Sequence, residues 1–129
     1  MFLALLALAL AASAQDLNRM PVRFPLGKTA ATVTGTIKGE QIIDYALNAA
    51  AGQQVNVTLD SRPSGVRFDV LPPASDQVLF DGSSSGNTWT GAIARGGEYT
   101  LRVYLAPDLA SQTAKYTLNI ALAGSRIEK

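Results

Sequence analysis

The chain has 129 residues, 47% hydrophobic and 16% charged, which is enough for one domain with an apolar core and does not indicate disorder. Its net charge is +1, and it lacks the basic stripe that binding to a nucleic-acid backbone requires. Histidine and cysteine are both absent, which excludes disulfides and thiolate nucleophiles and removes the usual zinc ligands and the commonest general base. The composition therefore favours a binding protein over an enzyme.

The amino-terminal residues 2–10 are apolar but too few to span a bilayer. Their length suits the hydrophobic part of a secretory signal, and Ala12-Ser13-Ala14 follows as a small-residue cleavage site before Gln15. The alternative is a short apolar membrane or core helix. We expect residues 1–14 to be a signal peptide and residues 15–129 to form one periplasmic or secreted domain that does not contact the membrane.

Short alternating segments, separated by glycine, proline and polar turns, fill the rest of the chain. The first of them should be an edge strand, because Pro21 and Pro25 cannot donate to a ladder. The expected strands cover residues 21–25, 28–38, 43–47, 55–59, 66–71, 78–80, 88–93, 96–105 and 116–122. Helix signals are nearly absent. The pattern predicts an all-β fold, an antiparallel β-sandwich of seven to nine short strands.

The clearest strand covers residues 96–105. Leu101 and Val103 lie on its apolar face, and Arg102 and Tyr104 lie on the opposite face. Residues 116–122 repeat this alternation, and we expect them to be the antiparallel neighbour of that strand. The loop between the two strands, residues 106–113, should then lie at one end of the fold.

Polar residues that could carry chemistry do not assemble into a recognisable catalytic set. The serines at 83–85 have no histidine to activate them, so we interpret residues 81–87 as a solvated, flexible loop. Asp69, Asp76 and Asp81 supply the oxygen ligands that calcium prefers, but no Asp-x-Asp-x-Asp-Gly loop is present. We expect no catalytic residue, no cofactor and no metal, with calcium at these aspartates as the alternative.

The aromatic residues could form a sugar-stacking platform or could belong to the core. Tyr45, Trp89, Tyr99 and Tyr116 fall at inward positions of their strands, which favours the core. Tyr104 is the exception, because it shares the outer face with Arg102 and is free to contact a partner. We expect Asp44, at an outward position, to pair with a lysine or arginine.

Several short motifs occur in a familiar order. They are Gly35-Thr36-Ile37-Lys38-Gly39, Asp44-Tyr45, Ala51-Gly52-Gln53, Val55 and Gly97-Glu98-Tyr99-Thr100-Leu101-Arg102-Val103. The chain resembles the bacterial periplasmic inhibitors of g-type lysozyme from about Val22 to Leu122. It is more loosely similar to the bacterial pre-peptidase C-terminal domain, a β-sandwich with a comparable progression of motifs. These motifs specify turns and core positions, so they indicate the fold more directly than the activity.

The resemblance implies that loops at one end of the sandwich enter the glycan cleft of a g-type lysozyme and block it. We assign this role to residues 81–87 and 106–113, because both loops are polar and flank well-defined strands. The expected partner-binding residues are Ser83, Ser84, Ser85, Asn87, Tyr104, Pro107, Asp108, Ser111 and Gln112. Inhibitors of this type tend to carry arginines in the second loop, whereas this loop has none, so recognition should depend on shape and hydrogen bonds.

Two function classes follow. The first is an exported, non-catalytic binding protein whose partner is a g-type lysozyme or another envelope protein. The second is an envelope-associated structural or carbohydrate-binding module of the pre-peptidase C-terminal type, whose partner is a glycan. An enzyme is the third and weakest class, because no activated nucleophile or acid–base pair can be assembled.

Overall fold

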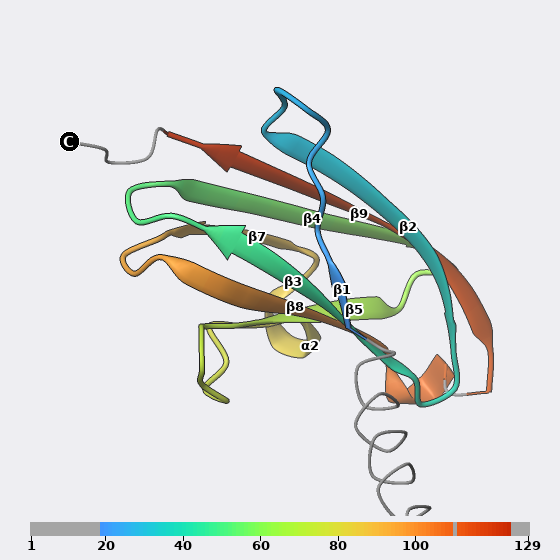
Figure 1. The fold of residues 1–129 in the computed structure, drawn as a ribbon. Coiled ribbons are helices and arrows are strands. Elements are labelled where there is room, and N and C mark those ends of the chain that lie inside the picture. The colour runs from blue at the N-terminus through green and yellow to red at the C-terminus, as the bar shows by residue number, and fades with distance from the viewer. Residues whose placement is uncertain (1–18, 110, 125–129) are drawn as a thin grey trace, which may run out of the picture.

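The computed structural model describes residues 19–109 and 111–124, which form two β-sheets packed face to face (Figure 1). The five-stranded sheet has the order β1 (Arg19–Pro21), β3 (Ile42–Ala49), β8 (Gly97–Leu105), β5 (Val66–Leu71) and β6 (Phe80–Asp81). The four-stranded sheet has the order β2 (Ala30–Lys38), β9 (Thr113–Ala123), β4 (Gln54–Arg62) and β7 (Thr88–Ala92). Neighbouring strands are antiparallel except for β1 and β3. The predicted all-β sandwich is confirmed.

The faces of the strands also agree with the prediction. In β8, Leu101 and Val103 are fully buried, while Arg102 and Tyr104 on the other face are half-buried. Nine-residue β2 turns its threonines toward solvent and buries Ile37. Because side chains alternate strictly along a strand, the apolar pattern alone fixes which face points inward.

The predicted pairing of β8 with β9 is wrong. The strand β8 lies between β3 and β5 in one sheet, and β9 lies between β2 and β4 in the other, so the chain crosses between the sheets after Leu105. Both strands have one apolar face, which suits neighbours within a sheet and strands that face each other across the core equally well. Periodicity therefore could not decide between these two arrangements.

Several element boundaries also differ from the prediction. The amino-terminal edge strand covers Arg19–Pro21 instead of residues 21–25, and it runs parallel to β3. The strand expected at residues 78–80 is reduced to Phe80–Asp81. Residues 81–87 contain a short helix, α2 (Gly82–Ser85), where a flexible loop was expected. The expected signal peptide, residues 1–14, lies outside the described residues.

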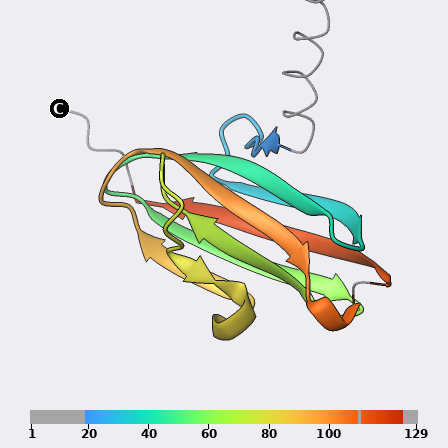
Figure 2. The same ribbon diagram turned by 90° about the horizontal axis from the view of Figure 1, so that it is seen from below.

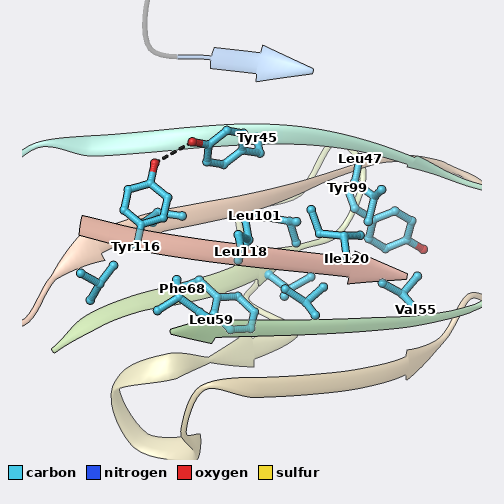
Figure 3. Close-up of a cluster of buried hydrophobic side chains, with 14 of the residues drawn as sticks. Tyr45, Leu47, Val55, Leu59, Phe68, Tyr99, Leu101, Tyr116, Leu118 and Ile120 are labelled. Carbon is cyan, nitrogen blue, oxygen red and sulfur yellow. Dashed lines mark hydrogen bonds between the residues drawn. The ribbon is translucent and has the colours of Figure 1, made fainter. Parts of the chain in front are cut away.

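The core consists of apolar side chains from both sheets (Figure 3), together with two tyrosines that face each other. Tyr45 of β3 and Tyr116 of β9 join their hydroxyls through a hydrogen bond of 2.6 Å, which satisfies both buried polar groups. Burial raises the pKa of the Tyr116 hydroxyl, and the bond to Tyr45 adds to this. The ring of Tyr116 passes directly over Gly35, where a Cβ atom would collide with it. Gly35 therefore makes room for the aromatic ring.

The outer face of the five-stranded sheet carries the expected partner of Asp44. Arg102 donates from Nε and Nη2 to the two carboxylate oxygens of Asp44, at 2.9 and 3.1 Å. The two residues are cross-strand neighbours in register. Because both side chains are partly exposed, the ion pair contributes about 0–1 kcal/mol to the free energy of unfolding.

Across residues 19–109 and 111–124, no helix has the length and apolar character needed to cross a bilayer.

Candidate functional site: a polar groove at one end of the sandwich

The two loops predicted to bind a partner meet at one end of the sandwich. Figure 2 shows α2 and the helical turn after β8 projecting on the same side of the sheets. Between them lies a hollow of about 370 Å³, which we call the terminal groove. It is lined by Ser64, Gly65, Val66 and Arg67 from the β4–β5 turn and β5, by Gly82, Ser83, Ser84, Gly86 and Asn87 from the first loop, and by Ala106, Asp108 and Leu109 from the second.

The first wall of the groove is the helix α2, which is held by its amino-terminal cap. The carboxylate of Asp81 accepts hydrogen bonds from the Ser83 backbone N–H at 2.9 Å and from the Ser83 hydroxyl at 2.6 Å. These bonds from Ser83 lower the pKa of Asp81 from its usual value. Gly82 lies so close to the backbone of Phe68 that a side chain would not fit between them. The helix is thereby pressed against β5.

The second wall is the 3₁₀ turn Pro107–Leu109, which is tied to the β4–β5 turn. The Ala106 N–H donates to the Gly65 carbonyl at 2.8 Å, and the Leu109 side chain packs over Gly65, where a Cβ atom would collide with it. The turn is closed by hydrogen bonds from Leu109 to Ala106 and from Gln112 to Leu109, both 2.9 Å. Both walls are therefore anchored by backbone contacts.

Tyr104 does not line the groove but is connected to its first wall through Asp69. Its hydroxyl donates to Asp69 Oδ1 at 2.9 Å, and the same oxygen accepts a hydrogen bond from the Gly82 N–H at 3.1 Å. Burial raises the pKa of Tyr104 to about 12, and the bond to Asp69 adds to the shift. Tyr104, Asp69 and Gly82 thus link the central strand β8 to β5 and α2.

Eight of the nine predicted partner-binding residues line three separate hollows. Ser83, Ser84, Asn87 and Asp108 line the terminal groove, and Ser85 is exposed on α2 outside its lining. The other four residues lie beside the β2–β3 turn. Tyr104 and Pro107 line one hollow there with Ile42, and Ser111 and Gln112 line another with Lys38. The end of the sandwich thus brings four of the nine residues together.

Sequence reasoning missed Arg67, which enters the groove from β5. Its Nη1 donates to the Ser83 carbonyl at 2.9 Å, so it also connects β5 to α2. The one signal in the sequence was a charged residue at an outward position between Val66 and Phe68, directly after a turn. Nothing in the local pattern showed that the serine loop, 16 residues later, folds back over it.

A wider hollow of about 770 Å³ adjoins the groove, because Ser64 and Asn87 line both. It extends over the four-stranded sheet, where Asp60, Arg62 and Lys115 contribute charges of both signs. Serine or threonine hydroxyls and the Asn87 amide are part of both linings, and these groups suit hydrogen bonding to a polar partner.

The aspartates considered for calcium do not assemble in the described residues. Asp69 and Asp81 are cross-strand partners, but each directs its Oδ1 to hydrogen-bond donors of the protein. Residues 19–109 and 111–124 contain no group of three or more His, Cys, Asp or Glu side chains arranged to hold a metal ion. The arrangement of the groove is suited to binding through hydrogen bonds and charge.

No family model matches the chain, and no curated protein matches it in sequence. Among solved structures, it is similar to PliG of Aeromonas hydrophila, a periplasmic lysozyme inhibitor of g-type lysozyme, with a TM-score of 0.74 and 25% identity over 82% of this chain and 96% of that one. The fold is that of the PliG inhibitors. A PliG mutant from Escherichia coli matches with a TM-score of 0.64 and 25% identity, over 81% of this chain and 97% of the other.

The looser resemblance is also confirmed at the level of the fold. The pre-peptidase C-terminal domain of a Bacillus anthracis collagenase matches with a TM-score of 0.56 and 18% identity, over 80% of this chain and 92% of that domain. The PliG structures match better by both measures. The two resemblances stated from the sequence therefore hold in the order in which they were stated.

Proposed function

We propose that the mature protein is an exported, non-catalytic inhibitor of a g-type lysozyme. In this proposal the two walls of the terminal groove enter the glycan cleft of the enzyme and block it. One observation carries this proposal. Two loops that each lead from the five-stranded sheet to the four-stranded sheet, after β6 and after β8, converge at one end of a PliG-like sandwich and form a polar surface there. Inhibition of this kind requires binding alone, which agrees with the absence of histidine and cysteine from the chain.

The walls of the groove are suited to this role because they are fixed before a partner arrives. The Asp81 cap holds α2, and the contacts of Gly65 with Ala106 and Leu109 hold the second wall. A surface ordered in advance loses little conformational entropy on binding, so more of the contact energy appears as affinity.

Export belongs to the same proposal. The PliG proteins are periplasmic by description, and residues 1–14 have the composition of a signal peptide. We expect the mature chain to begin at Gln15. Intact-mass measurement of the periplasmic protein tests this, and a mass that still includes residues 2–10 would contradict it.

The experiment that tests inhibition is the clearing of a bacterial suspension by a g-type lysozyme with and without the mature protein. Ser84→Trp places a large side chain in the groove and should abolish inhibition. Its control is Ser75→Trp, an exposed serine beyond the opposite end of β5, which should inhibit as the wild type does. Equal inhibition by both variants would show that the groove is not the contact surface.

The alternative envelope module predicts a different result. A protein that leaves lysozyme activity unchanged and sediments with purified peptidoglycan would be a glycan-binding module of the pre-peptidase C-terminal type. The supporting observation is the hollow over the four-stranded sheet, because the threonine and serine hydroxyls and the Asn87 amide of its lining suit sugar hydroxyls. The similarity between this chain and the collagenase domain is a similarity of fold alone.

A further inference from the structure

The guanidinium of Arg67 is the unusual group of the terminal groove. Its Nη1 donates to the Ser83 carbonyl, but its Nε is buried and has no hydrogen-bond partner in the described part of the chain. A guanidinium offers five donors in a planar fork that matches a carboxylate. A buried N–H without a hydrogen-bond partner destabilises a folded protein. Because Nε has almost no access to solvent, a ligand in the groove would reach the guanidinium through its Nη nitrogens.

Asp81 lies close enough for the charge of Arg67 to contribute to its lowered pKa, but no carboxylate of the described residues forms an ion pair with Arg67. Asp69 accepts hydrogen bonds from Tyr104 and Gly82, and Asp81 accepts from Ser83. Within residues 19–109 and 111–124, the ion pairs join Arg19 to Glu98 and Arg102 to Asp44, and none includes Arg67. The positive charge therefore stands at the groove without an acidic partner at ion-pair distance.

The rest of the groove suits an anion held by hydrogen bonds. Ser64, Ser83 and Ser84 bring hydroxyls to the lining, and Asn87 brings an amide. Asp108 is the acidic residue of the lining, on the second wall, and it opposes an incoming anion. A hollow of about 370 Å³ is near the lower end of the range for ligand pockets, so it fits one side chain better than a chain of sugars.

We propose that the terminal groove receives an acidic side chain of a partner protein, with its carboxylate paired to Arg67 and held by the serine hydroxyls and the Asn87 amide. This inference rests on the proposed function, since it names the chemistry by which the inhibitor would grip its target. The charge that the second loop lacks is thereby supplied from strand β5. Recognition then includes one ion pair in addition to shape and hydrogen bonds.

The first test uses acetate as the probe and does not involve lysozyme. In ¹H–¹⁵N spectra of the mature protein, the Arg67 Nε–H and the Ser83 and Ser84 amides should shift in a saturable manner with acetate but not with chloride at equal ionic strength. Arg67→Gln should weaken acetate binding by at least about tenfold. Arg95→Gln, a matched change of an exposed arginine before β8, should bind acetate as the wild type does.

A second variant keeps the test valid if Arg67→Gln disturbs the fold. Asp108→Asn removes the opposing charge while leaving Arg67 in place, and it should tighten acetate binding about two- to fivefold. Shifts that do not saturate, or equal acetate affinity in the wild type and in a folded Arg67→Gln variant, would overturn the proposal. So would an Asp108→Asn variant that binds acetate more weakly.

The third test measures how Arg67 variants inhibit lysozyme in the clearing assay. Arg67→Gln should lose inhibition, and Arg67→Lys should not restore it fully, because an ammonium cannot form the two parallel bonds of a guanidinium. Full inhibition by Arg67→Gln would show that the partner's carboxylate is not held in the groove. A wild type that binds acetate at Arg67 but does not inhibit lysozyme would refute the proposed function and leave the carboxylate site established.

Discussion

The hydroxyl of Tyr45 lies 2.6 Å from that of Tyr116, and the two residues belong to different sheets. Figure 3 shows this bond at one end of the apolar cluster. Each tyrosine contributes an aromatic ring to the core and satisfies the polar group of the other. A hydrogen bond thus joins the two layers of the sandwich inside an otherwise apolar interior.

Removing one of these hydroxyls should cost more than removing both. Tyr116→Phe leaves the Tyr45 hydroxyl buried without its partner, and we expect the free energy of unfolding to fall by about 1–3 kcal/mol. The double change Tyr45→Phe with Tyr116→Phe should be closer to the wild type, since no polar group is then left unsatisfied. Denaturant unfolding of the four proteins forms a double-mutant cycle, and strictly additive effects would contradict this account.

The inward position of Leu101 in the central strand leads to a second prediction. Leu101 is fully buried, so Leu101→Ala should lower the free energy of unfolding by about 2–5 kcal/mol. Ser84→Ala, at an exposed position of α2, should change it very little. The measurement is the denaturant midpoint of each variant, and equal midpoints would show that the assigned strand phase is wrong.

Gly82 provides a third prediction, because its close approach to the Phe68 backbone positions α2. Gly82→Ala should destabilise the protein by about 1–3 kcal/mol through overpacking, and it should shift the first wall of the groove. The neighbouring change Ser85→Ala has no such contact and serves as the control. Thermal unfolding measures the stability. An unchanged melting temperature for Gly82→Ala would mean that α2 is held less tightly than the structure indicates.

Stability at high pH should depend on Tyr104. Its pKa in the folded protein is about 12, above the value of about 10 for an unfolded chain. A raised pKa means that the contribution to stability is complete below pH 10 and is lost as the pH rises from about 10 to about 12. The wild type should therefore lose more stability over this interval than Tyr104→Phe. Parallel slopes for the two proteins would indicate that burial and the bond to Asp69 do not raise the pKa of the Tyr104 hydroxyl.

The strand positions and the inward faces could be predicted from the sequence because they depend on neighbouring residues. Residues 66–71 were predicted with the observed bounds of β5. The partner of β8 could not be predicted, because an apolar face does not reveal whether its complement lies beside it or opposite it. The helix α2 was missed since serine is a weak helix former, although Asp81 at its start is a favourable capping residue.

The candidate site was predictable only in part. Polar loops indicated which segments lie at the surface, and four of the nine predicted partner-binding residues share the terminal groove. Ser64 lies in the β4–β5 turn, and Arg67 lies in the strand β5 that follows this turn. Their proximity to the serine loop results from the packing of α2 onto β5, which no local pattern encodes.

The two walls of the groove differ in the strands that carry them. The second wall continues from β8, which has hydrogen-bonded neighbours on both sides. The helix α2 instead lies between β6 and β7, which are each at the edge of a sheet. Edge segments open at lower free energy than central strands, so amide hydrogens near α2 should exchange with solvent sooner than those of β8. A partner that fills the groove should therefore slow exchange mainly around α2, where the free protein has most protection to gain.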